Sequence, residues 1–199
     1  PLGYGRLFDH PVLNWRFETE PEPELNGRRI AQPRGRVLGG SSSINGLLYV
    51  RGQQQDFDAW RGAGAIGWGW DDVRPYFQRA ENYEDGRIGW HGVDGPLSVS
   101  GPRDTHPLCD AFIAAGREAG LPDNPDFNGT SQDGVGYYHG TARAGRRCSA
   151  AVAYLNPVRR RPNLRILTGA HAQRILVKDQ RAIGIEWMAG GERRRALGG

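Results

Sequence analysis

The sequence predicts a mixed α/β fold, with helices in the middle of the chain and strands near its end. Between residues 105 and 119, apolar side chains recur every three or four positions, as on one face of a helix. Residues 163–168, 173–177 and 182–187 instead alternate between apolar and polar side chains, which is typical of strands. The polar run 178–181 separates the last two segments, so the sequence predicts a β-hairpin there.

The other elements are predicted from caps, turn residues and shorter patterns. Gly39 and Gly40 precede three serines, so we expect a helix that starts near Ser42, runs to Arg51 and ends at Gly52. The weaker patterns predict a helix at 56–60, a helix at 71–81 with Pro75 in its first turn, a strand at 97–99, a short helix at 149–155, and a strand at 193–196 after the turn Gly190-Gly191.

Composition narrows the class of protein. The 199 residues suit one large domain or parts of two, and 26 Lys and Arg against 22 Asp and Glu give a formal net charge of +4. The arginines are scattered rather than aligned in a stripe, which argues against a nucleic-acid-binding module. Two cysteines are too few for a disulfide framework and favour a reducing, cytoplasmic compartment. No apolar run approaches the ~20 residues that a membrane helix needs.

Two patterns that could carry chemistry are interpreted as structural. Residues 62–67 match the Gly-x-Gly-x-x-Gly pattern of dinucleotide-binding folds, but they follow a predicted helix rather than a strand, so we expect a plain loop. The five histidines show no metal-ligand spacing, so no metal site is predicted and each is interpreted as structural or solvated. His91 lies in a turn-like segment and is expected to shape a loop.

The segment 33–52 is the strongest candidate for a binding site. Two glycines remove side chains where a ligand could approach the backbone closely. The hydroxyls of Ser41, Ser42 and Ser43 and the free N–H groups of the expected helix would face the same place, where the positive helix end attracts an anion. The residues alone leave two interpretations open: a phosphate or other anion site, and a simple capped turn.

The same segment resembles the first hallmark segment of the glucose–methanol–choline (GMC) oxidoreductases. It reads Pro-Arg-Gly-Arg-Val-Leu-Gly-Gly-Ser-Ser-Ser-Ile-Asn-Gly-Leu-Leu-Tyr-Val-Arg-Gly. The resemblance continues along nearly the whole chain, through residues 13–15, 67–71, 91–96, 126–129, 132–136, 161–164 and 181–186. Many segments in the right order are far more specific than any single pattern. The branch resembled is that of bacterial alcohol dehydrogenases, with choline dehydrogenases as near neighbours.

The resemblance implies a non-covalent FAD site. In this family the hallmark segment wraps the flavin and its pyrophosphate, which implies cofactor contacts for Val37, Gly39, Gly40, Ser41, Asn45, Gly46, Leu47, Leu48 and, near the adenine end, Ala172. The amide of Asn45 would bond a flavin heteroatom; the alternative is an amide on a helix surface. Some relatives tether the flavin through a histidine, and Ile44 at the matching position implies that no such bond forms here.

The resemblance also implies how the chain is organised. An FAD/NAD(P)-binding-type domain would contribute an FAD-wrapping segment at 1–52 and a β-rich return at 150–199. Residues 53–149 would form a helical and loop insertion on the cap or substrate side. The family's N-terminal dinucleotide fingerprint is not found, nor is its C-terminal pair of His with His or Asn, which accepts the alcohol proton. We therefore expect an internal segment of a longer enzyme, with no catalytic residue and no activity of its own.

The activity implied for the whole enzyme is FAD-dependent oxidation of a primary alcohol to an aldehyde, with electrons passed to a quinone-like acceptor. One alternative is a choline dehydrogenase or oxidase of the same family. Others are a flavin-containing lyase on the same scaffold and a catalytically incomplete FAD-binding fragment. The expected partners are a small alcohol and an electron acceptor, without nucleic acid. The expected location is cytoplasmic, and a peripheral association with a membrane stays open.

Overall fold

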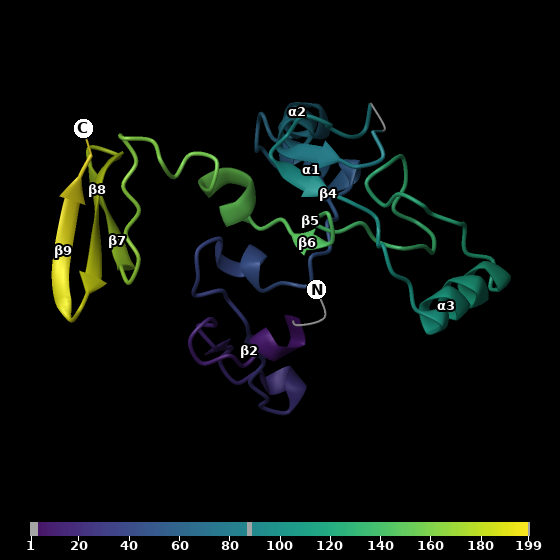
Figure 1. The fold of residues 1–199 in the computed structure, drawn as a ribbon, viewed down its shortest axis with the longest axis horizontal. Coiled ribbons are helices and arrows are strands. Elements are labelled where there is room, and N and C mark those ends of the chain that lie inside the picture. Colours follow the sequence, from purple (N-terminus) through teal and green to yellow (C-terminus); the bar gives the residue numbers. More distant parts are fainter. Residues whose placement is uncertain (1–3, 87–88, 199) are drawn as a thin grey trace. The chain divides into compact units, whose positions relative to one another are not determined.

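The computed structural model describes residues 4–86 and 89–198 (Figure 1). The chain divides into two compact units, residues 1–157 and residues 158–199. The first unit combines helices with short strand pairs, and the second is a single antiparallel sheet. The mixed α/β class predicted from the sequence is therefore confirmed.

Two of the predicted helices pack against each other in the first unit: α1 (Gln54–Gly62) and α2 (Trp70–Ala80). Their contact is aromatic, because the ring of Phe57 lies 5.8 Å from that of Trp70 and 5.7 Å from that of Phe77. The glycine-rich pattern falls at the end of α1 and in the loop that joins the two helices, as predicted, so it has no strand before it.

The remaining elements of the first unit are short apart from one helix. That helix is α3 (Pro107–Glu118), and it buries Ile113. Its N-cap is His106, one residue after Thr105, where the sequence predicted the cap. The strand pairs are β1 (Phe17–Glu18) with β2 (Ala31–Gln32), β3 (Glu81–Tyr83) with β4 (Leu97–Val99), and β5 (Ala142–Arg143) with β6 (Arg146–Arg147). Of these three pairs, β3–β4 is parallel and the other two are antiparallel. Short helical turns are η1 (Tyr4–Leu7), η2 (Pro23–Leu25), η3 (Gly40–Ser43) and η4 (Ala151–Leu155), the last of them a π-helix.

The helix predicted for residues 42–51 is wrong. Only the four-residue 3-10 turn η3 forms, and Leu47 then adopts a left-handed φ of 73°. The side chain of Asn45 accepts the backbone N–H of Leu47 at 3.1 Å, and Leu48 bridges to Gly140. The helix ends early for two reasons: the Asn45 side chain competes for a backbone donor, and the backbone of Leu48 pairs with Gly140 instead of continuing the helix.

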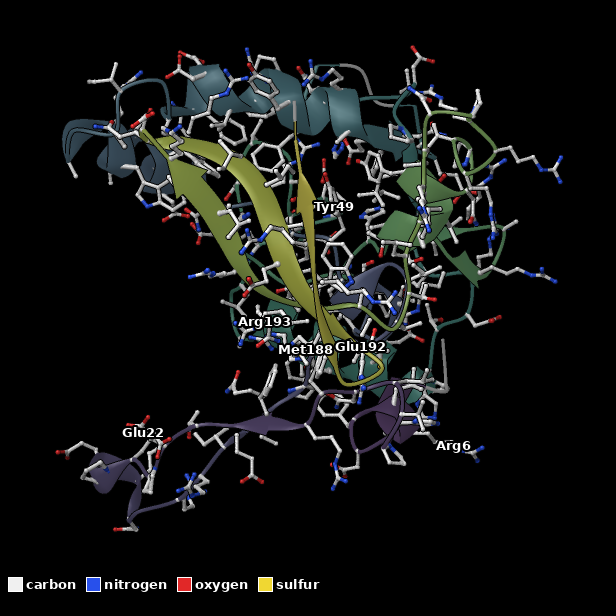
Figure 2. All side chains as sticks on the ribbon, turned by 90° about the vertical axis from the view of Figure 1, so that its left-hand side faces the viewer. Arg6, Glu22, Tyr49, Met188, Glu192 and Arg193 are labelled. Atoms are coloured by element: carbon white, nitrogen blue, oxygen red, sulfur yellow. The ribbon has the colours of Figure 1, made fainter. Side chains whose placement is uncertain are left out.

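The second unit is a three-stranded antiparallel sheet in the order β7 (His171–Lys178), β8 (Arg181–Ala189), β9 (Glu192–Leu197). These strands and their two turns confirm the hairpin and the last strand predicted from the sequence. Met188, Glu192 and Arg193 lie at the same end of the β8–β9 hairpin (Figure 2). The strand predicted at 163–168 is wrong, because no neighbouring strand in the described residues supplies it with a hydrogen-bond ladder.

Candidate functional site

The predicted binding segment is a tight turn whose glycines serve different purposes. Gly39 and Gly40 have left-handed φ angles of 87° and 56°. A Cβ atom on Gly39 would lie 2.5 Å from Oγ of Ser43, so packing within the turn requires glycine there. A Cβ atom on Gly40 or Gly46 would meet no atom within 4 Å. These two positions therefore face open space next to the turn.

The three serine hydroxyls are bound to the backbone of the chain itself. Ser41 Oγ accepts a backbone N–H at 3.2 Å, and Ser43 Oγ donates to a backbone carbonyl at 2.8 Å. Ser42 Oγ donates to the carbonyl of Gly39 at 2.5 Å and accepts the N–H of Ala150 at 2.9 Å. The long helix at whose start these hydroxyls were expected does not form, and each of the three bonds to the backbone of the chain. The hydroxyls stabilise the shape of the turn.

Arg147 holds the same turn from a distant part of the sequence. Its Nη1 donates to Asn45 Oδ1 at 2.7 Å and to the carbonyl of Ser42 at 3.0 Å, and its Nη2 donates to the carbonyl of Asn45 at 2.7 Å. Partial burial lowers the pKa of Arg147, which still leaves a permanent cation. Arg147 was not among the predicted site residues, because 102 positions separate it from Asn45 and no local pattern marks the contact.

A shallow, mainly apolar hollow of about 230 Å³ opens beside the turn. It is lined by Phe8, Pro33, Ser41, Ile44, Asn45 and Gly46. Ile44 is buried, whereas Asn45 and Gly46 are exposed. The hollow thus combines apolar walls with an exposed amide, an arrangement suited to a flat ligand with polar atoms at its edge.

The other predicted site residues lie at the turn, except for Ala172, which lies in the second unit. Val37 and Leu48 are exposed and flank the turn, while the side chain of Leu47 is buried. Ala172 lies on β7 in the second unit, opposite Trp187 of β8. The structure thus brings Val37 and the residues from Gly39 to Leu48 together in one segment and places Ala172 on a different unit.

A second group of polar side chains includes Arg51, which follows this segment closely in the sequence, and is largely buried. We call it the Glu81 cluster; it consists of Arg51, Glu81, His91 and Asp126. Arg51 Nη2 lies 2.5 Å from Glu81 Oε2. His91 Nδ1 lies 3.1 Å from both Glu81 oxygens, and its Nε2 lies 2.9 Å from Asp126 Oδ2. Two cations and two anions are therefore held together, with Arg51, Glu81 and His91 buried and Asp126 partly exposed.

The contacts of His91 determine its charge. Burial lowers the pKa of His91, but the hydrogen bonds to Asp126 and Glu81 outweigh it and raise the pKa to about 9. Burial also raises the pKa of Asp126, but the bond from His91 and the backbone N–H of Asn128 bring it below the usual value. Both ring nitrogens face carboxylates, so both must donate, which only the imidazolium form does.

Residues near the Glu81 cluster hydrogen-bond to the backbone of Tyr49 and Arg51, just after the candidate site. Asn128 Oδ1 accepts the N–H of Arg51 at 2.7 Å, and Asn128 Nδ2 donates to the carbonyl of Tyr49 at 2.9 Å. Gln132 Nε2 donates to the carbonyl of Arg51 at 2.7 Å. His91 therefore shapes its surroundings structurally, as predicted. Among the described residues, no three His, Cys, Asp or Glu side chains are grouped as metal ligands would be.

The chain matches a known family over most of its length. Residues 17–197 match the family described as GMC oxidoreductase, and the chain belongs to this family. It is 51% identical over 178 residues to an oxygen-dependent choline dehydrogenase of Rhizobium etli, which covers 89% of this chain and 32% of that protein. It is 49% identical over 179 residues to the Brucella anthropi protein of the same name, covering 90% and 32%. The chain thus spans about a third of the length of these curated relatives.

Solved structures show the same fold. A pyridoxine 4-oxidase from Mesorbium loti matches with a TM-score of 0.89 and 36% identity, over 98% of this chain and 39% of that one. An FAD-dependent oxidoreductase from Chaetomium thermophilum matches with a TM-score of 0.83 and 28% identity, over 94% of this chain and 35% of that one. The family consists of flavoproteins that bind FAD. None of the helices among the described residues is both long enough and apolar enough to cross a bilayer.

Proposed function

We propose that the enzyme containing this chain oxidises choline, or a closely related primary alcohol, to the aldehyde with FAD. The observation that carries the proposal is the identity of about half of all residues to oxygen-dependent choline dehydrogenases, over nine-tenths of the chain. Choline is a primary alcohol, so the proposal is a narrower form of the primary-alcohol oxidation expected from the sequence. It favours choline, the alternative substrate named there, over a simple aliphatic alcohol.

We propose that the turn around Gly39–Leu48 contributes to the FAD site. The open space at Gly40 and Gly46 and the apolar hollow beside Asn45 support this assignment, because a bulky flat group could approach the backbone there. The proposed contacts are Val37, Gly39, Gly40, Ser41, Asn45, Gly46, Leu47, Leu48 and, toward the adenine, Ala172. Ile44 offers no nucleophile, which supports non-covalent binding.

When bound, FAD accepts a hydride from the alcohol carbon. The residues of this chain would bind and orient the cofactor, and none of them is proposed as the base that takes the hydroxyl proton. The proposed organisation has three parts: an FAD-wrapping segment at 1–52, an insertion on the substrate side at 53–149 and a β-rich return at 150–199.

The substrate is tested with the complete protein, purified with FAD. Oxidised flavin absorbs near 450 nm and loses this absorption when it is reduced. Anaerobic mixing with choline should therefore bleach the protein, and 1-butanol at equal concentration should bleach it much more slowly. A protein that takes up no FAD would overturn the proposal. Bleaching by butanol but not by choline would overturn the substrate while leaving the alcohol-oxidising activity in place. FAD uptake without bleaching by any alcohol would favour the lyase alternative.

The electron acceptor needs a separate experiment. The names of the relatives favour oxygen, whereas the resemblance of the sequence by itself implied a quinone-like carrier. Choline turnover is measured in air, with peroxide quantified, and anaerobically with a soluble quinone analogue. Peroxide formed in step with aldehyde supports oxygen; fast anaerobic turnover with little peroxide in air supports the quinone.

A further inference from the structure

We propose that Arg147 is a positioning residue that fixes the side-chain amide of Asn45 as a hydrogen-bond donor toward the bound flavin. The inference rests on the proposed FAD site and deepens it. It assigns a role to a residue outside the hallmark segment and a direction to the hydrogen bond that Asn45 makes.

The orientation of the Asn45 amide follows from its two neighbours. The backbone N–H of Leu47 lies 3.1 Å from Asn45 Oδ1, and Arg147 Nη1 lies 2.7 Å from the same atom. A backbone N–H and a guanidinium can only donate, so the oxygen of the amide must face both. The NH2 group is left over, and within the part of the chain that the structure describes it has no hydrogen-bond partner. Asn45 is exposed and lines the apolar hollow.

Three hydrogen bonds hold the guanidinium of Arg147 in place. Besides Asn45 Oδ1, it binds the carbonyls of Asn45 and Ser42, at 2.7 and 3.0 Å. The strand that carries Arg147 is fixed in turn, because Thr141 N–H donates to the Leu47 carbonyl and Cys148 N–H donates to the Thr141 carbonyl, both at 2.8 Å. Arg147 therefore binds the side chain and the backbone of Asn45 together, which the single ammonium group of a lysine cannot reproduce.

A fixed donor at this place would act on the flavin in a defined way. The ring system of a flavin carries carbonyl oxygens and ring nitrogens that accept hydrogen bonds, and it gains negative charge on reduction. An oriented N–H donor stabilises that charge more than it stabilises the neutral ring. Loss of the donor should therefore weaken FAD binding and also make the bound flavin harder to reduce.

The test uses the complete protein and three variants. Arg147→Lys keeps the positive charge but removes the guanidinium group that makes the three hydrogen bonds to Asn45 and Ser42. Asn45→Asp keeps an acceptor for Arg147 and Leu47 but removes the NH2 donor. Arg146→Lys is the matched control, because Arg146 is the preceding residue on β6, is exposed and has a side chain on the opposite face of the strand. The measurements are the Kd of the apoprotein for FAD, the visible flavin spectrum, the midpoint potential and the melting temperature of the apoprotein.

For Arg147→Lys and Asn45→Asp, we expect FAD binding to weaken about tenfold, the midpoint potential to fall and the flavin spectrum to shift. Arg146→Lys should match the wild type in all of these. If Arg147→Lys melts at too low a temperature to be assayed, Asn45→Asp, which keeps the arginine contacts, still tests the donor.

Three outcomes would overturn the inference, and they are distinguishable. A wild-type protein that binds no FAD removes the proposed function and the inference with it. A wild type that binds FAD, together with Arg147→Lys and Asn45→Asp variants whose potential and spectrum equal those of Arg146→Lys, overturns the inference alone. A lower melting temperature with an unchanged potential would show that Arg147 has a structural role only and would also overturn it.

Discussion

Arg51 and Glu81 form an ion pair in which Nη2 lies 2.5 Å from Oε2 and the two side chains are only 2% and 0% exposed. His91 and Asp126 complete the group, so that two positive and two negative charges balance. Such a group adds little net stability over apolar packing, but it becomes costly as soon as one member is removed. Because Arg51 directly follows the candidate site, the cluster connects the local stability of that site to residues 81, 91 and 126.

The first prediction concerns the buried pair itself. Glu81→Gln should lower the free energy of unfolding by about 3–5 kcal/mol, because it leaves Arg51 and His91 short of negative charge inside the protein. Urea unfolding measures the change. The control is Glu84→Gln, which breaks the exposed pair of Glu84 with Arg103 and should cost less than about 1 kcal/mol. Equal effects of the two substitutions would contradict the prediction.

The second prediction concerns pH. The pKa of His91 is about 9 in the folded protein and near 6.5 in the unfolded chain, so folding favours the protonated form. This contribution of about 3 kcal/mol at most is fully present below pH 6.5 and is lost as pH rises through 9. The free energy of unfolding should therefore decline between pH 7 and 10. In Asp126→Asn, one carboxylate partner is missing, so the folded pKa of His91 should be lower and the decline should be smaller and end at a lower pH; an identical profile would contradict the assignment.

The third prediction separates glycines needed for folding from glycines needed for a ligand. Gly39→Ala combines a left-handed φ with a clash against Ser43, so it should lower the melting temperature of the apoprotein and cost about 2 kcal/mol. Gly46→Ala adds a methyl group to open space and should leave the stability of the apoprotein within about 0.5 kcal/mol of the wild type. Its affinity for FAD should fall, because the methyl group would occupy space proposed for the cofactor. Wild-type affinity in Gly46→Ala would argue against a ligand contact there.

The fourth prediction is a stabilising change in the sheet. Asp179 and Gln180 join β7 and β8 with φ angles of 48° and 61°, the two left-handed positions of a tight hairpin turn. Replacing them with Asn-Gly, the pair that such turns prefer, should stabilise the protein by about 1 kcal/mol. Differential scanning calorimetry would show a higher melting temperature. An Asn-Gly variant no more stable than the wild type would mean that this hairpin does not limit the unfolding measured.

Local patterns were sufficient where an element depends on its own residues. The apolar spacing before Gly120, the acidic residues at the start of α2 and the alternation of β7 and β8 each predicted an element that the structure contains. Pro75 was expected in the first turn of α2, which is wrong, because the helix already begins at Trp70 and Pro75 lies inside it. The same approach failed at residues 42–51 and 163–168. A capping pattern gives no information about a distant partner such as Gly140, and an alternating pattern forms a strand only if another strand lies beside it.

The sequence by itself determined the fold class and the membership of the GMC family, because these follow from periodicity and from ordered motifs along the chain; it also indicated the segment for which the cofactor contacts are proposed. Only the tertiary structure revealed Arg147 against Asn45 and Arg51 against Glu81. Those contacts join residues 102 and 30 positions apart, and a hydrogen bond or ion pair depends on separation in space, which no local pattern encodes.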